Sequence, residues 1–223
     1  MMIAENLQRI RATLKPNVRL VAVSKFHPVE ALQEAYDMGQ RIFGENHVQE
    51  LVAKEEVLPK DIEWHFIGHL QTNKVKYIAR FVSMIHSVDS VKLLKEINKQ
   101  AEKCGRTIDV LLQIHVAKEE TKFGFTPDEV VQMLEGDEWK ACSNVRIVGL
   151  MAMATNTDNE AQITAEFETV RQLSDTLKSR FFADQPAFKE ISMGMSGDYL
   201  IAQEHGSTMV RVGSQIFGER IYQ

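Results

Sequence analysis

The segment "VRLVAVSKFHPVEALQEAYDMG" at residues 18–39 contains one complete strand-and-helix unit. Its first half is almost continuously apolar and rich in valine, which is typical of a β-strand buried on both faces. Its second half, from Pro28 to Gly39, spaces apolar residues three or four apart and has charged residues on the other side, which predicts an amphipathic helix. The segment therefore predicts a parallel strand covered by a helix.

The same alternation continues along the whole chain. A capping box of Thr126 and Glu129 around Pro127 marks the start of one later helix, and Gly105 marks the end of another. A further helix is expected at residues 3–14, before the first strand. Strand-like apolar runs recur at 41–46, 62–69, 82–88, 108–116, 145–153, 188–195 and 208–213.

Eight strand-and-helix repeats after one extra helix predict an α/β fold, a single (β/α)8 TIM barrel. An open, doubly wound sheet stays the alternative, because alternation alone does not prove that the sheet closes. The functional groups of a TIM barrel gather at the carboxyl ends of its strands. These ends are therefore where we look for a site.

Composition limits the classes of protein that the chain could represent. Of its 223 residues 44% are hydrophobic and 26% are charged, with a formal net charge of −5 at pH 7. These values are ordinary for a folded protein, and they give no long-range attraction for nucleic acid or an anionic membrane. We expect one domain over residues 1–223, with neither nucleic acid nor membrane as a partner.

The cysteines indicate the compartment. Cys104 and Cys142 lie far apart and form no CxxC pair, which is typical of thiols in a reducing environment. We therefore expect a cytoplasmic protein.

Lys25 is the first candidate site residue, because it stands where the first apolar strand ends. A lysine at this place often extends its amine into water and has no further role. The alternative is functional: an amine at the rim of a low-dielectric barrel loses some of its preference for the protonated form, and a neutral amine attacks an aldehyde to form a Schiff base.

Two Gly/Ser turns follow the last two predicted strands, "SMGMSGD" at 192–198 and "VGSQ" at 212–215. Such turns expose backbone N–H groups, and a helix that begins there adds a partial positive charge. TIM barrels often hold a phosphate at the loops after strands seven and eight. The turns therefore favour a phosphate site, although two tight turns without a ligand are the simpler reading.

Arg211 lies two residues before Gly213, so both face the same side of the last strand. A buried guanidinium needs a partner. A carboxylate such as Glu45 or Glu190 is one candidate, and a ring nitrogen of a ligand is the other.

Other signals are weaker. His65 and His69 have no carboxylate cluster beside them, so no metal site is predicted. The methionines alternate along two strands in the way that core-filling residues do; they are Met151, Met153, Met193 and Met195.

Several motifs together carry a family resemblance over residues 18–222. They are "AVSK", "FGEN", "WHFIGHLQTNK", "GLMAM", "SMGMSGD" and "GSTMVRVG". With them the sequence resembles the YggS/PROSC family, the pyridoxal 5′-phosphate homeostasis proteins. The resemblance implies a barrel like the N-terminal domain of alanine racemase, of fold type III among pyridoxal phosphate-binding proteins.

The resemblance also implies roles for individual residues, and none of them is catalytic. Lys25 looks like the lysine that forms a Schiff base with pyridoxal 5′-phosphate, and Arg211 looks like the partner of its pyridine nitrogen. Ser196, with the backbone of Gly213 and Ser214, looks like the phosphate cradle. Asn46 looks like a polar neighbour of the cofactor ring.

We therefore expect a protein that buffers or delivers pyridoxal phosphate and acts only indirectly on amino-acid and keto-acid metabolism. Arginine cannot protonate the pyridine nitrogen as an acid would, which weakens carbanion chemistry. Only ten residues follow Gly213. From this we expect no second, racemase-type domain, and a monomer that transiently meets pyridoxal phosphate-dependent apoenzymes.

Two enzymatic alternatives stay open. One is a single-domain racemase that uses Lys25, with His65 or His86 as the second base. The other is a Schiff-base aldolase that acts on a phosphorylated sugar and has no cofactor.

Overall fold

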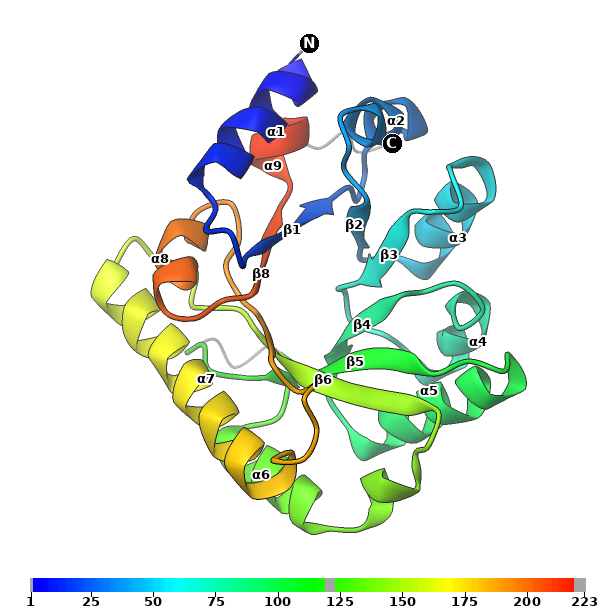
Figure 1. Ribbon diagram of the computed structural model, residues 1–223, viewed down its shortest axis with the longest axis vertical. Helices are drawn as coiled ribbons and strands as arrows, with labels where there is room; N and C mark the ends of the chain where they lie inside the picture. The colour runs from blue at the N-terminus through cyan, green and yellow to red at the C-terminus, as the bar shows by residue number, and fades with distance from the viewer. Residues whose placement is uncertain (1, 119–122, 219–223) are drawn as a thin grey trace.

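Eight parallel strands close into a barrel in the computed structural model, which describes residues 2–118 and 123–218 (Figure 1). Each of the eight predicted apolar runs contains one strand, so the predicted strand set is confirmed. The strands are β1 (Arg19–Val23), β2 (Ile42–Glu45), β3 (Glu63–Phe66), β4 (Met84–Val88), β5 (Ile108–Ile114), β6 (Val145–Ala152), β7 (Glu190–Ser192) and β8 (Met209–Val212).

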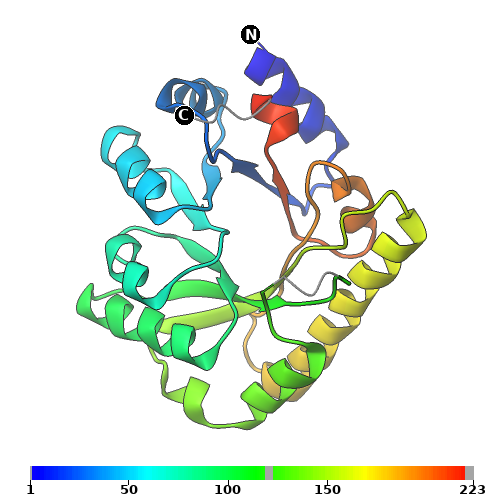
Figure 2. The ribbon, with the colours of Figure 1, turned by 180° about the vertical axis from the view of Figure 1, so that it is seen from behind.

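Helices follow every strand and lie outside the barrel (Figures 1 and 2). The predicted capping box is present at α6, where Thr126 Oγ1 accepts from the Glu129 backbone N–H at 3.2 Å. The α-helices are α1 (Met2–Thr13), α2 (Val29–Asp37), α3 (Val48–Val57), α4 (Val75–Ile78), α5 (Val91–Lys103), α6 (Pro127–Glu135), α7 (Glu160–Phe181), α8 (Tyr199–Glu204) and α9 (Ser214–Phe217), with short 3-10 helices at Thr72–Lys74 and Glu138–Ala141.

Pairing between the first and last strands closes the barrel. β1 and β8 run parallel, with Val21 opposite Arg211 and Ala22 opposite Val212. The closed barrel is therefore confirmed, and the open doubly wound sheet is excluded. Because closure is complete, residues near both ends of the chain meet at one rim.

The core has two parts, as alternation along each strand requires. Leu20 and Ala22 of β1 belong to the large cluster that also contains the buried faces of the helices. Val21 points the other way, into a small cluster contributed by the strands; its buried members are Val21, Met84, Leu111, Val148, Met151 and Met209. This small cluster fills the barrel interior below the carboxyl ends of the strands.

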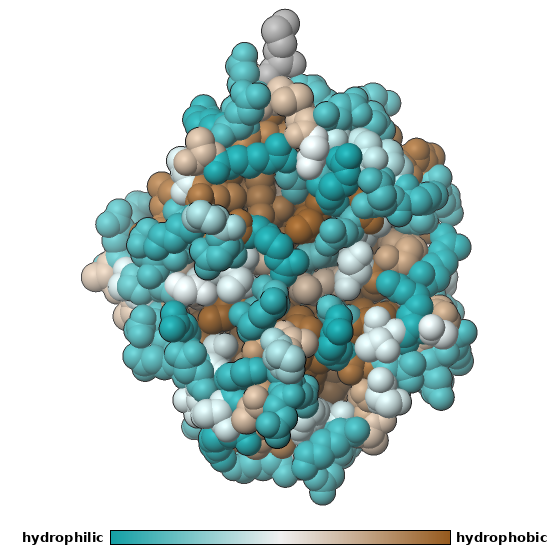
Figure 3. Space-filling view, in the orientation of Figure 1, coloured by the Kyte–Doolittle hydropathy of each residue, from teal (hydrophilic) through white to brown (hydrophobic). Residues whose placement is uncertain are grey.

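The extra N-terminal helix is also confirmed. α1 lies beside α9, and the Asn6 side-chain amide donates to the carbonyl oxygen of Ile216 at 3.0 Å (Figure 1). The face in Figure 3 is largely hydrophilic, with apolar side chains visible in hollows between the polar ones. Among the described residues, no helix has the length and apolarity to cross a membrane. That residues 1–223 form one domain stays a prediction.

Candidate functional site

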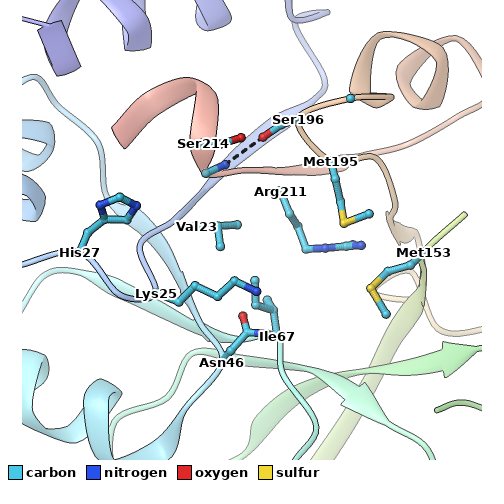
Figure 4. Close-up of a pocket in the computed structure, with 12 residues that line it drawn as sticks. Val23, Lys25, His27, Asn46, Ile67, Met153, Met195, Ser196, Arg211 and Ser214 are labelled. Atoms are coloured by element: carbon cyan, nitrogen blue, oxygen red, sulfur yellow. Dashed lines mark hydrogen bonds between the residues drawn. The ribbon is translucent and has the colours of Figure 1, made fainter. Parts of the chain in front are cut away.

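A cavity of about 240 Å³ opens at the carboxyl ends of the strands (Figure 4). All six predicted site residues line it, although they come from four separate stretches of sequence. They are Lys25, Asn46, Ser196, Arg211, Gly213 and Ser214. The structure therefore brings the whole predicted set together.

Lys25 enters the cavity from the turn that follows β1. Its side chain reaches inward beside Asn46 and Ile67, while the Arg211 side chain lies across the cavity (Figure 4). The next residue, Phe26, has a φ of 64°. This left-handed conformation is unfavourable for a bulky residue and persists only where its surroundings enforce it.

The two Gly/Ser turns meet at another side of the cavity. The backbone N–H of Gly213 points to Ser196 Oγ at 3.4 Å (Figure 4). The Gln215 side chain donates to the Ser196 carbonyl at 2.6 Å. A Cβ at Gly213 would lie 2.9 Å from the carbonyl oxygen of Val23, so this close approach requires glycine. α9 begins directly after it, at Ser214, and its first turn has N–H groups without intrahelical partners.

Arg211 is buried and is held by neutral groups. Its Nη1 donates to the Ser192 carbonyl at 2.8 Å and to Ser192 Oγ at 2.6 Å, and its Nη2 donates to the Ala152 carbonyl at 2.9 Å. Burial lowers the pKa of Arg211 to about 10, so the guanidinium stays charged at neutral pH. No carboxylate is hydrogen-bonded to this charge in the described structure, which leaves it able to attract an anion or an acceptor nitrogen.

The two carboxylates that the sequence offers as partners for Arg211, Glu45 and Glu190, are both paired with other cations. Glu45 pairs with Lys54 at 2.7 Å, and Glu190 pairs with Arg19 at 3.0 Å.

A chain of buried polar side chains continues from Arg211 into the barrel. Ser192 Oγ lies 2.9 Å from His86 Nδ1, and His86 Nε2 lies 2.9 Å from His65 Nδ1. Because Arg211 can only donate, the Ser192 hydroxyl is free to donate to His86, which in turn donates to His65. Burial lowers the pKa of His65 to about 3 and that of His86 well below its ordinary value, so both rings are neutral.

These two histidines do not serve the racemase alternative. Both are buried, and neither is among the residues that line the cavity. The racemase alternative, in which one of them supplies the second base, is therefore not favoured.

The prediction that all four methionines fill the core is wrong for two of them. Met151 and Met193 are buried as predicted, but Met153 and Met195 line the cavity, and Met195 is 36% exposed. The signal lay in the period of two, since Met153 continues the inward face of Met151 past the end of β6. The other lining residues that sequence reasoning missed are Val23, His27, Ile67 and Gly197.

Asn46 carries an observation that points to a ligand. Its Oδ1 atom is buried and receives no hydrogen bond from the described residues. A buried polar atom without a partner is costly, and such atoms call for an explanation. Lys25 and Arg211 line the same cavity, so an acceptor at its wall fits a polar ligand that has a donor group of its own.

No metal site accompanies this arrangement in the described part of the chain, where no group of three or more His, Cys, Asp or Glu could hold a metal ion. His69 lies outside β3, with its Nδ1 atom 3.4 Å from a carboxylate oxygen of Asp89.

Comparisons with known proteins identify the family to which this chain belongs. The family model "Alanine racemase, N-terminal domain" matches residues 2–221. A pyridoxal phosphate homeostasis protein of Aquifex aeolicus is 41% identical over 205 residues, which are 92% of this chain and 88% of the relative. Its Homo sapiens counterpart is 42% identical over 216 residues, which are 92% and 77% of the two chains. This chain belongs to the family of pyridoxal phosphate homeostasis proteins.

Solved structures agree with membership in this homeostasis family. PipY of Synechococcus elongatus PCC7942 with pyridoxal phosphate bound has a TM-score of 0.87 and 38% identity, over 97% of this chain and 100% of that one. An alanine racemase of Clostridium difficile 630 has a TM-score of 0.81 at 15% identity, over 100% of this chain and 58% of that one. The second likeness shows the fold alone.

Proposed function

We propose that this protein binds pyridoxal 5′-phosphate in the cavity at the carboxyl ends of the strands and takes part in the homeostasis of that cofactor. The observation that carries the proposal is the charge of the lining. Among the described residues two cations, Lys25 and Arg211, line the cavity, and no carboxylate does. A phosphorylated, aromatic aldehyde is complementary to such a lining. The names of the relatives, which describe homeostasis proteins, and the ligand of PipY support the proposal.

Each predicted residue has a role in binding that its position supports. The amine of Lys25 forms a Schiff base with the aldehyde and releases water. Ser196, with the backbone N–H groups at Gly213 and Ser214, binds the phosphate at the start of α9. Arg211 donates to the pyridine nitrogen, and the unpartnered oxygen of Asn46 accepts from a polar group of the ligand.

The same residues favour holding the cofactor over catalysis with it. When bound, pyridoxal phosphate supplies an electron sink, which works best with a protonated ring nitrogen. Arg211 keeps its own proton at neutral pH and acts there as a hydrogen-bond donor. The protein therefore acts as a carrier or regulator of the cofactor and not as an enzyme.

We further propose that the protein is a cytoplasmic monomer. It transfers its cofactor during transient contact with pyridoxal phosphate-dependent apoenzymes. Two free thiols, the exposed Cys104 and the buried Cys142, support a reducing compartment. Light scattering tests the oligomeric state, and transfer of bound cofactor to an apoenzyme in a two-chamber dialysis cell tests whether contact is needed.

Borohydride trapping tests the site. Purified protein incubated with pyridoxal phosphate should show a visible absorption band, and reduction with borohydride should lock the label on the peptide that contains Lys25. Lys25→Met should abolish the band, whereas Lys92→Met at an exposed position of α5 should keep it. A wild-type protein that takes up no pyridoxal phosphate would refute the proposal.

Solvent-exchange measurements test the non-enzymatic part. The loaded protein is incubated with single enantiomers of amino acids in deuterated water. We expect no useful rate of deuterium entry at the α-carbon, and sustained exchange with many turnovers would instead establish a racemase.

A further inference from the structure

A buried ionic cluster lies directly behind the turn that carries Lys25. Lys54 of α3 is 5% exposed, and its ammonium group has three acceptors at the same distance of 2.7 Å: the Ser24 carbonyl, Glu45 Oε1 and Glu50 Oε1. An ammonium group has three N–H donors, so its hydrogen-bonding capacity is filled by these contacts. Neither Lys54 nor the two glutamates line the cavity.

The cluster holds the chain on both sides of Lys25. Before it, the Ser24 hydroxyl donates to Glu45 Oε1 at 2.6 Å, in addition to the bond between the Ser24 carbonyl and Lys54. After it, the backbone N–H of Phe26 donates to Glu50 Oε1 at 2.6 Å. Phe26 is the residue in the left-handed conformation, with φ of 64°. The charged cluster thus holds the strained step of the backbone next to the amine.

We propose that Glu45, Glu50 and Lys54 are positioning residues for Lys25: they clamp Ser24 and Phe26 so that the amine is directed into the cavity in the orientation that the aldehyde needs. The inference rests on the proposed function of Lys25, and it adds three residues that do not line the cavity.

Energetics favour positioning over simple stabilisation as the reason for such a cluster. Taking charges out of water is costly, and buried ion pairs are often no more stabilising than well-packed apolar residues of similar volume. Charged hydrogen bonds are nevertheless short and directional, which suits them to hold a turn in a conformation that it would not adopt by itself.

The protonation of Glu45 is consistent with this geometry. Burial is the largest influence and raises its pKa to about 7, against the opposing effects of Lys54 and Ser24. Both hydrogen bonds reach Oε1, while Oε2 is buried without a partner, so a proton on Oε2 leaves the two bonds in place. The clamp therefore persists in either state of Glu45.

Glu50 is the most selective place to test the clamp. Glu50→Ala removes the acceptor for Phe26, whereas Glu50→Gln keeps an oxygen there. A matched control is Glu190→Ala, which removes a carboxylate that accepts from Thr208 at 2.6 Å and pairs with Arg19 at 3.0 Å at the amino end of β7. The three variants and the wild type are compared by the rate of Schiff-base formation with pyridoxal phosphate, followed by visible absorption.

We expect Glu50→Ala to slow Schiff-base formation by about tenfold or more, because the reacting amine loses its fixed orientation. Glu50→Gln should stay within about threefold of the wild type, since the hydrogen bond to Phe26 is retained. Glu190→Ala should react at the wild-type rate even where its thermal stability falls equally. A wild-type rate in Glu50→Ala, or an equal slowing in Glu190→Ala, would overturn the proposal.

A second measurement needs no cofactor. Hydrogen–deuterium exchange at the Phe26 amide of the ligand-free protein should become faster in Glu50→Ala, and it should stay slow in Glu50→Gln and Glu190→Ala. If Glu50→Ala does not fold, Ser24→Ala serves in its place; it removes one hydroxyl and should give a smaller slowing of the same kind, and a wild-type rate there would overturn the clamp. Failure of the wild type to bind pyridoxal phosphate would refute the proposed function, whereas the exchange result would still judge the clamp.

Discussion

Lys54 and Arg211 are two buried cations that the barrel holds in opposite ways. Lys54 contacts two carboxylates, Glu45 and Glu50, besides one carbonyl. Arg211 contacts two carbonyls and one hydroxyl, all neutral. Both cations are about 95% buried, with exposed fractions of 5% and 4%.

The difference separates a structural cation from a binding one. A cation that is already paired with carboxylates has little attraction left for a ligand, so Lys54 serves the chain around it. Among the described residues, Arg211 has only neutral hydrogen-bond partners. Asp198 is the carboxylate that acts on its charge, but it is not hydrogen-bonded to the guanidinium, which therefore keeps most of its attraction for an approaching acceptor. The partner set, and not burial, therefore indicates which buried cation belongs to the site.

The largest effect is expected from Lys54→Met. The substitution leaves the Glu45 carboxylate buried without its cation, and loss of one member of a buried pair costs about 3–5 kcal/mol of the free energy of unfolding. Urea denaturation at pH 7.5 measures this change. Lys140→Met, in an exposed ion pair with Asp137, is the control and should change little. Equal effects in the two variants would contradict the distinction between these pairs.

A smaller effect concerns the two buried, neutral histidines behind Arg211 and the loss of protein stability at acid pH. His65 has a folded-state pKa of about 3, below its unfolded value of about 6.5. The unfolded chain therefore binds the extra proton first, and stability is lost as the pH falls below 6.5. Between pH 7.5 and 5 this histidine alone should cost about 2 kcal/mol.

His65→Gln provides the check. Its free energy of unfolding should fall less than that of the wild type between these two pH values, by about 2 kcal/mol. Parallel pH profiles for the two proteins would show that the ring of His65 is not held neutral.

Arg211→Met should weaken binding of the ligand. A ligand loses a charged donor that is worth about 1.5–3 kcal/mol, or roughly tenfold to a hundredfold in affinity. The carbonyls of Ser192 and Ala152 lose the same charged donor, so the ligand-free protein is also less stable. Fluorescence titration with pyridoxal phosphate measures the dissociation constant, and thermal unfolding of the ligand-free protein measures stability. A variant that unfolds readily but binds normally would reverse the roles assigned to the two cations.

The smallest effect is expected for Asn46→Ala. Because Asn46 Oδ1 has no partner among the described residues, its removal should leave the stability of the ligand-free protein almost unchanged. Affinity for pyridoxal phosphate should fall by about threefold to tenfold, as expected for one neutral hydrogen bond. An unchanged affinity would assign this oxygen no role in binding.

Strand positions could be predicted from the sequence because parallel barrel strands are buried on both faces. Runs such as residues 18–25 and 108–116 therefore stand out as continuously apolar. Closure could not be predicted in this way, since pairing of β1 with β8 leaves no local signal in either strand. Most of the site residues could be predicted because they follow strands, where barrels gather function, while Arg211 lies within β8 itself and the role of Asn46 came from the family resemblance.

What the sequence could not reveal was the partner of each buried charge. The sequence left carboxylates as candidate partners for Arg211. Only the register of β7 beside β8 shows that Ser192 is its hydrogen-bond partner. Lys54 follows Glu50 by four residues, which on a helix is typical of an exposed ion pair. That this pair is turned inward, toward the turn at Lys25, depends on how α3 packs against the barrel.

Closure of β1 onto β8 has a consequence for synthesis of the chain. Arg211, Gly213 and Ser214 leave the ribosome at least 186 residues after Lys25. The cavity is complete only when the last strand has paired with the first, a contact of very large sequence separation that forms late and slowly. A chain truncated before β8 would thus present the amine without the guanidinium and the turn opposite it, so tight capture of the ligand reports that translation has reached the final strand.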